Sequence, residues 1–127
     1  MIPYEDLIGK PFKLGGRGPE EYDCYGMVME LLTRQGVNPE DYGHHSDSQM
    51  VEMMMTTAER TQNWEKVSIQ EGCLLLFRVG RFIRHVGFYI GGNKFIHCWD
   101  KSNGVVIETF SADWANRLIG CYKYVQK

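Results

Sequence analysis

The sequence lacks any long apolar run. No stretch approaches the roughly 18 consecutive apolar residues that a membrane-spanning helix needs. The opening residues, MIPYEDLIGKPFK, carry acidic side chains where a signal peptide would have its apolar centre. We therefore expect a soluble chain that no visible signal exports.

An excess of positive charge is also missing. Lysine and arginine total 14 against 16 aspartates and glutamates, and the formal net charge is -2. A protein that gains its affinity by neutralising phosphates needs a basic surface. Nucleic-acid binding is therefore a poor interpretation of this composition.

The four cysteines lack the paired C-x-x-C spacing of zinc and redox motifs. Free thiols in a reducing compartment are the simplest interpretation, and we expect Cys73, Cys98 and Cys121 to be buried without a chemical role. A chain of 127 residues with 43% apolar side chains can bury its own core without a disulfide or a structural metal. We expect one domain spanning 1–127.

The first half of the chain has the periodicity of helices. Asp23 precedes a segment in which apolar residues recur at helical spacing, and Gly36 follows as a stop signal. This pattern predicts a helix over 24–35, with Cys24 in its first turn. A capping-box spacing that begins at Ser46, followed by an apolar stripe, predicts a second helix to about residue 61.

The second half changes to short segments rich in β-branched and aromatic residues, separated by glycine, asparagine or charged turns. We expect a meander of antiparallel strands at 73–79, 84–90, 94–99, 105–110 and 119–125. Helices followed by strands indicate an α+β domain. In it, N-terminal helices would pack on a C-terminal antiparallel curled sheet or small barrel.

Cys24 is a candidate nucleophile because of its predicted position at the start of a helix. Unpaired N–H groups and aligned peptide dipoles favour a thiolate there. A single cysteine on an apolar helical stripe is, however, more often core packing. The nucleophile hypothesis therefore depends on a base elsewhere in the chain.

Two histidines on neighbouring strands supply that base. A three-residue loop at 91–93 would place His97 opposite Gly87, on the same face as His85 and diagonal to it. A two-residue loop would shift the register by one and turn His97 to the other face. A thiol, an imidazole base and an orienting polar group are the parts of an activated-thiol site.

Five segments occur in a fixed order along the chain. They are GGRGP at 15–19, YDCYGMV at 22–28, GCLLLFR at 72–78, HVGFYI at 85–90 and FIH at 95–97. This order resembles the NlpC family of papain-like cysteine peptidases over most of the chain, from about residue 8 to 124. The GGRGP segment, with GVVIE at 104–108 and LIGCY at 118–122, is most similar to the branch found in bacteriophage tails and prophages.

The resemblance implies a papain-like fold of the circularly arranged NlpC type. It also implies a thiol protease, a hydrolase that cuts peptidoglycan stem peptides of the bacterial cell wall, commonly between γ-D-glutamate and diaminopimelate. Cys24 would be the nucleophile, His85 the general base and His97 the residue that orients the base. The amide of Cys24 would help to stabilise the oxyanion, and neither a metal nor an organic cofactor is needed.

The resemblance also implies substrate contacts. Tyr22 matches the family's aromatic residue beside the catalytic cleft, and Asp23 matches an acid on the substrate side. Tyr25 stands where many members have serine, and Trp99 is the best candidate among the tryptophans for a substrate groove. Cys73 follows Gly72 where the family usually has aspartate, from which we expect altered loop packing rather than lost activity.

Two other functions fit the same residues. One is a non-catalytic phage tail-tip or wall-binding module that kept the fold, and the other is a thiol amidase or acyltransferase that acts on non-wall amides, since a fold and a triad do not choose a substrate. The expected partners are stem peptides and phage tail proteins. We expect synthesis in the bacterial cytoplasm, followed by incorporation in a phage tail or release by lysis.

Overall fold

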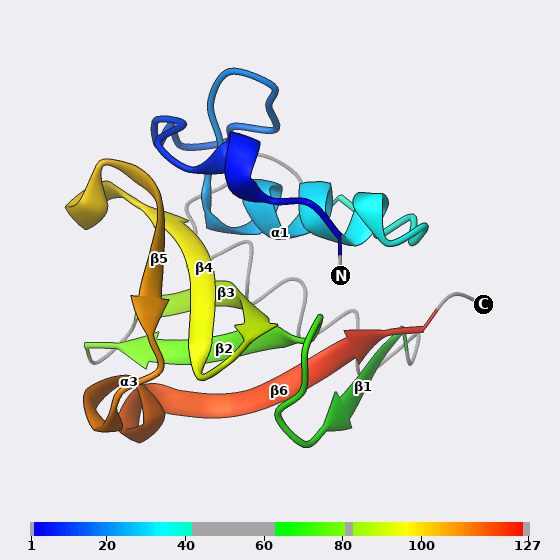
Figure 1. The fold of residues 1–127 in the computed structure, drawn as a ribbon, viewed down its shortest axis with the longest axis vertical. Helices are drawn as coiled ribbons and strands as arrows, with labels where there is room; N and C mark the ends of the chain where they lie inside the picture. The colour runs from blue at the N-terminus through cyan, green and yellow to red at the C-terminus, as the bar shows by residue number, and fades with distance from the viewer. Residues whose placement is uncertain (1, 42–62, 81–82, 126–127) are drawn as a thin grey trace.

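The computed structural model describes residues 2–41, 63–80 and 83–125. The helical elements are η1 (Glu5–Leu7), α1 (Cys24–Arg34), η2 (Asp100–Ser102) and α3 (Ala112–Arg117). The strands are β1 (Trp64–Val67), β2 (Leu74–Val79), β3 (Ile83–Gly91), β4 (Lys94–Trp99), β5 (Gly104–Thr109) and β6 (Leu118–Tyr124), all shown in Figure 1. The second helix predicted from Ser46 onward lies outside the described residues.

Helix α1 begins and ends where the sequence predicts. The side chain of Asp23 accepts a hydrogen bond from the amide of Gly26, which caps the N-terminus. Gly36 follows the helix with a φ of +84°, a conformation in which a side chain would be strained. Cys24 is therefore the first residue of the helix, as predicted.

The six strands form one antiparallel sheet in the order β1-β6-β2-β3-β4-β5. The α+β class and the antiparallel pairing are confirmed, but the prediction of a simple meander is wrong at the last strand. Helix α3 turns the chain after β5, so that β6 returns beside β2. The prediction also missed the short strand β1, which pairs with β6 at the edge of the sheet.

The β3–β4 hairpin reaches the predicted register by a different route. Gly91 pairs with Lys94, which leaves a two-residue turn instead of the expected three-residue loop. A register shift between Tyr89 and Gly91 then compensates for the shorter turn, so that Tyr89 pairs with Phe95 as the prediction requires. His97 consequently keeps the face that was expected for it.

The sheet curls, and each of its faces buries a separate core. In Figure 1, β4 and β5 run at a steep angle relative to β2 and β6, and α1 lies across one side of the sheet. The core on the α1 side contains Cys24, Val86 and Cys98. The core on the other side is aromatic, built around Phe77 and Trp114.

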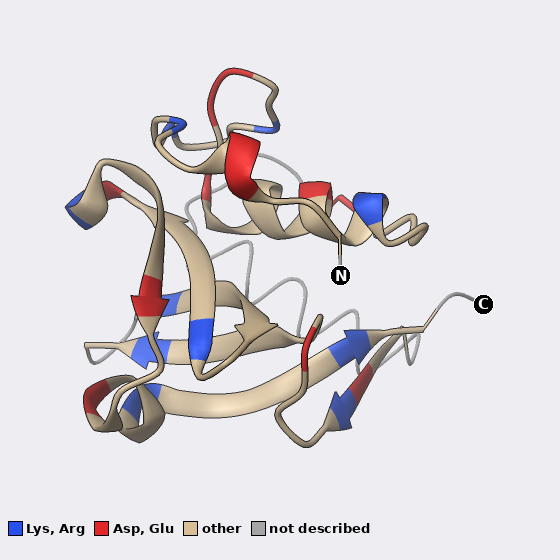
Figure 2. Cartoon of the chain, in the orientation of Figure 1, with Lys and Arg blue, Asp and Glu red and all other residues tan. Residues whose placement is uncertain are grey.

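Charges of both signs are interspersed along the described chain (Figure 2). The N-terminal segment is held by β5, because the amide of Gly9 donates to the carbonyl of Val105 and the amide of Val105 donates to that of Lys10. In the described ranges, none of the helices has the length and apolarity required to cross a bilayer.

Candidate active site

The N-terminus of α1 is fixed by the carboxylate of Asp23. It accepts hydrogen bonds from the amide of Gly26 at 2.6 Å, the amide of Gly15 at 3.1 Å and Nη1 of Arg17 at 2.7 Å. The side chain of Asp23 is fully buried. These contacts give Asp23 a structural role at the first turn that carries Cys24, while its expected contact with substrate stays a prediction.

The glycine-rich loop packs directly on this first turn. A Cβ on Gly26 would overlap the carbonyl oxygen of Gly16, and a Cβ on Gly16 would lie 2.8 Å from the Cα of Tyr22. The amide of Asp23 donates to the same Gly16 carbonyl at 3.1 Å. Glycine at positions 16 and 26 therefore permits a backbone approach that brings the loop against the start of the helix.

Arg17 connects this loop to the segment that follows the helix. Its Nε and Nη2 atoms donate to the two carboxylate oxygens of Asp41 at 3.0 and 3.1 Å, while Nη1 donates to Asp23. Burial alone would lower the pKa of Arg17, but the hydrogen bonds with Asp41 and Asp23 raise it. The guanidinium therefore remains charged between two acids.

The two predicted histidines are joined by a hydrogen bond. Nε2 of His85 lies 2.8 Å from Nδ1 of His97, and Nε2 of His97 lies 2.5 Å from Oε2 of Glu108. His85 is only 3% exposed and His97 is completely buried. The prediction that the two imidazoles share one face of the sheet is confirmed.

Burial determines the charge of both imidazoles. It lowers the pKa of His85 well below 6.5, and the neighbouring His97 lowers it further. Burial also lowers the pKa of His97, although the hydrogen bond with Glu108 acts in the opposite direction. His85 is therefore neutral near pH 7, which is the state in which an imidazole accepts a proton.

Aromatic rings surround the histidine pair. The ring centroid of Trp99 lies 5.0 Å from that of His85 and 5.2 Å from that of His97, and Trp114 lies 5.3 Å from His97. Phe77 stacks on His85 at 6.4 Å. This apolar enclosure accounts for the low pKa of His85.

The sequence analysis missed two residues of this group, Glu108 and Trp114. Glu108 lies on β5, which pairs with β4 so that His97 faces Val106 and Glu108 is its diagonal neighbour. That register depends on the connection through η2, for which the sequence offers no turn signal of known length. Trp114 lies on α3, a six-residue helix that was not predicted.

The expected substrate-side residues occupy different environments. Tyr22 and Tyr25 are buried, and the hydroxyl of Tyr25 donates to the carbonyl of Glu40 at 2.8 Å. Trp99 is half-buried beside both imidazoles. Of the predicted contacts, Trp99 is thus the one that the structure places against the histidine pair.

The position of Cys24 is set by α1. The helix packs against β3 and β4, the two strands that carry His85 and His97. The thiol itself belongs to the core on the α1 side, whereas the imidazoles belong to the aromatic side. The structure therefore brings His85 and His97 together with Glu108, and the meeting of the Cys24 thiol with His85 stays a prediction.

The other three cysteines are buried, as predicted, and none of the four, which all lie in the described ranges, forms a disulfide. Burial raises the pKa of Cys73, and burial together with the Cys73 thiol raises that of Cys121 to about 11. The thiol of Cys98 donates to the carbonyl of Tyr22 at 3.2 Å. Among the described residues, no three histidine, cysteine or acidic side chains gather into a group that could hold a metal ion.

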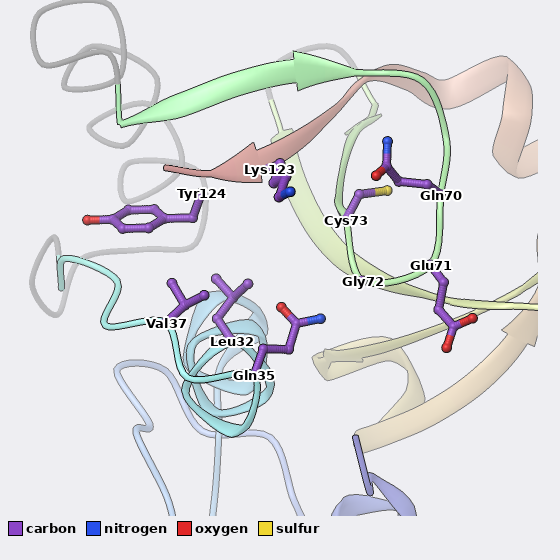
Figure 3. Close-up of a pocket in the computed structure, with 9 residues that line it drawn as sticks. All are labelled: Leu32, Gln35, Val37, Gln70, Glu71, Gly72, Cys73, Lys123 and Tyr124. Carbon is purple, nitrogen blue, oxygen red and sulfur yellow. The ribbon is translucent and has the colours of Figure 1, made fainter. Parts of the chain in front are cut away.

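Two cavities lie outside the histidine pair. One, of about 370 Å³, runs along the glycine-rich loop at 13–21. The other, of about 320 Å³, lies at the C-terminal end of α1 (Figure 3). Its walls are Leu32, Gln35, Val37, Gln70, Glu71, Gly72, Cys73, Lys123 and Tyr124. These described walls contain a thiol of raised pKa and no imidazole, so they do not supply the parts of an acyl-transfer site.

Known proteins match this chain over most of its length. A murein DD-endopeptidase and LD-carboxypeptidase of Escherichia coli, MepS, is 33% identical over 121 residues, which are 92% of this chain and 57% of that protein. A protein of Listeria grayi named probable endopeptidase p60 is 32% identical over 89% of this chain and 20% of its own length. The chain thus spans little more than half, or less, of these curated relatives.

Solved structures share the fold at lower identity. A Staphylococcus aureus protein of the NLP/P60 family superposes with a TM-score of 0.65 and 21% identity, over 97% of this chain and 39% of that one. The NlpC/p60 domain of the peptidoglycan hydrolase SagA has a TM-score of 0.60 and 21% identity, over 94% and 91%. The family model described as the NlpC/P60 family matches residues 9–123. Because this match includes the first turn of α1, both histidines and all of the sheet except the last residue of β6, this chain belongs to the NlpC/P60 family.

Proposed function

We propose that this domain is a cysteine peptidase that hydrolyses amide bonds of peptidoglycan stem peptides. Cys24 is the nucleophile, His85 the general base and His97 the residue that orients the base. The observation that carries the proposal is the buried, neutral His85 held by His97 on the strands that α1 crosses. The printed names of the relatives from E. coli and L. grayi support the substrate class.

The proposed reaction begins with proton transfer from the Cys24 thiol to Nδ1 of His85. The sulfur then attacks the carbonyl carbon of the stem peptide, and the amide of Cys24 stabilises the oxyanion. As the tetrahedral intermediate collapses, the C–N bond breaks and the leaving amine takes the proton from His85. Water, deprotonated by His85, then hydrolyses the thioester and regenerates the thiol. No redox step or cofactor is required.

The proposal requires the thiol to come within hydrogen-bonding reach of His85. The start of α1 is anchored by the buried Asp23, which fixes where the thiol can be. Nε2 of His85 is already occupied by His97, so Nδ1 is the nitrogen left for the thiol. Catalytic hydrogen bonds are often longer in a substrate-free enzyme and shorten once substrate binds.

The test is digestion of purified sacculi with the domain, followed by mass spectrometry of the released muropeptides. Cys24→Ala should abolish product release, whereas Cys73→Ala, which also removes a buried thiol, should retain it. Folding of both variants is checked by far-UV circular dichroism. Product release by Cys24→Ala at the parent rate would refute the nucleophile, and a parent protein that releases nothing would favour a non-catalytic wall-binding module.

Trp99 is proposed as the wall of the substrate groove. Its half-buried ring lies against both imidazoles, and Lys101 lies 5.4 Å above it. Trp99→Ala should raise KM for a defined stem peptide more than it lowers kcat. An unchanged KM would remove Trp99 from the groove.

We further propose that the domain reaches the wall as part of a phage tail or after lysis. Support comes only from the segments at 15–19, 104–108 and 118–122, which are similar to those of phage-tail relatives. Proteomics of purified phage particles should detect the chain with the tail proteins. Its absence from particles, together with confinement to intact cells, would contradict this route.

A further inference from the structure

We propose that Glu108 is a positioning residue that selects the tautomers of both histidines, and thereby leaves Nδ1 of His85 without a proton. The inference rests on the proposed function for its consequence in catalysis, but not for its geometry. Glu108, His97 and His85 form an unbroken chain of two hydrogen bonds from β5 to β3.

The proton positions follow from the first link of the chain. An ionised carboxylate can only accept hydrogen bonds, so Nε2 of His97 must donate its N–H to Glu108. In a neutral His97 this leaves Nδ1 as an acceptor. Nε2 of His85 must then donate to it. A neutral His85 with its proton on Nε2 presents a lone pair at Nδ1, which is the state a general base needs.

The carboxylate is itself held in place. Its second oxygen, Oε1, accepts a hydrogen bond from Nε1 of Trp114 at 3.4 Å, while Oε2 binds His97. The Glu108 side chain is 38% exposed, so water also reaches it. His97 is completely buried, so its Nε2–H depends on Glu108 as its acceptor.

Apart from Glu108, the recorded neighbours of His97 in the described ranges are aromatic rings. It is faced by His85 from β3, Phe95 and Trp99 from β4, and Trp114 from α3. Two cations lie one layer farther out, Lys101 on the ring of Trp99 and Arg117 on the ring of Trp114. Among the described residues, Glu108 is thus the carboxylate that contacts the histidine pair.

Removal of the carboxylate should reverse the direction of the hydrogen bond between His97 and His85. Without Glu108, His97 can carry its proton on Nδ1 and donate it to Nε2 of His85, which then holds its own proton on Nδ1. That tautomer cannot accept a proton from a thiol at Nδ1. The loss in kcat should therefore be at least about tenfold, and no larger than the roughly 10²–10⁴-fold that a general base contributes.

The experiment compares Glu108→Ala with Glu108→Gln, whose amide oxygen can still accept from Nε2 of His97. The tautomers are read from imidazole 15N shifts at pH 8 in a Cys24→Ala background, so that no thiolate can protonate His85. Glu65→Gln, an exposed change on β1, is the matched control. We expect Nε2–H tautomers on both histidines in the parent, Glu108→Gln and the control, and a shift toward Nδ1–H on His85 in Glu108→Ala.

Activity is measured separately, on the same substitutions in the protein that retains Cys24. Glu108→Gln should recover most of the kcat that Glu108→Ala loses, with KM nearly unchanged. An Nδ1–H tautomer in the parent, or an unaltered His85 tautomer in Glu108→Ala, would overturn the role of Glu108. If the tautomers change as expected while the parent releases no muropeptides, the positioning role holds and the peptidase proposal fails.

Discussion

Replacement of Asp23 by alanine should destabilise the domain by about 3 kcal/mol. The substitution removes the cap of α1, which contributes about 1 kcal/mol. It also breaks the ion pair of the fully buried Asp23 with Arg17, whose side chain is 17% exposed. Breaking a buried ion pair costs about 3–5 kcal/mol when one charge is left unpaired. Arg17 keeps its two hydrogen bonds to Asp41, and the bonds of one carboxylate are not additive. The total loss of stability should therefore lie near the lower end of the roughly 3–5 kcal/mol range, at about 3 kcal/mol.

Urea unfolding followed by far-UV circular dichroism measures this loss. With a slope of roughly 1.5–2 kcal/mol per molar urea, the midpoint should fall by about 1.5–2 M at an unchanged slope. Asp23→Asn keeps an acceptor for the amide of Gly26, so its urea midpoint should lie between those of the parent and Asp23→Ala. Asp6→Ala is the matched control, because it also removes a carboxylate bound by an arginine, Arg34, but at an exposed position.

A midpoint shift for Asp23→Ala no larger than that of Asp6→Ala would refute this reasoning. It would mean that the buried carboxylate contributes no more than an exposed ion pair does. The anchoring of the first turn of α1 would then have to come from the packing of the glycine-rich loop alone.

Two further predictions concern stability. Burial lowers the folded-state pKa of His85 and His97, so the unfolded chain binds more protons than the folded one below pH 6.5. The free energy of unfolding should therefore fall as the pH is lowered below 6.5, with a slope approaching about 1.4 kcal/mol per pH unit for each histidine. His85→Gln should flatten this slope in urea unfolding between pH 7 and 5, and an identical slope would exclude His85 as its source. Tyr25→Phe should lose about 1 kcal/mol, since it removes the hydrogen bond to the Glu40 carbonyl, and a chain as stable as the parent would show that water replaces that bond.

The sequence predicted the local elements well, because their signals are local. Asp23 and Gly36 delimit a helix by capping and chain reversal, and both positions agree with α1 to within a residue. The strand predictions depended on alternation, which also gave the shared face of His85 and His97. That success relied on compensation, since the register shift after Tyr89 offset a turn shorter than predicted.

The features that the sequence could not supply depend on contacts between distant segments. The return of β6 to β2 is set by α3, a helix too short to be predicted from hydrophobic periodicity. Glu108 meets His97 only because β5 pairs with β4 in one particular register. The enclosure of Asp23 depends on Arg17 and Gly15, which are placed by a loop without regular structure.

The reactivity of Cys24 tests the central claim most directly, and it requires no knowledge of the natural substrate. The folded parent protein and His85→Gln are treated with iodoacetamide between pH 6 and 9, and peptide mass spectrometry gives the alkylation rate of each cysteine. We expect Cys24 of the parent to react near pH 7 faster than a free thiol and faster than Cys73 and Cys121, which are buried as Cys24 is. The rate should fall at least about tenfold in His85→Gln. Alkylation of Cys24 no faster than a free thiol, and equal in the two proteins, would contradict a thiol activated by His85.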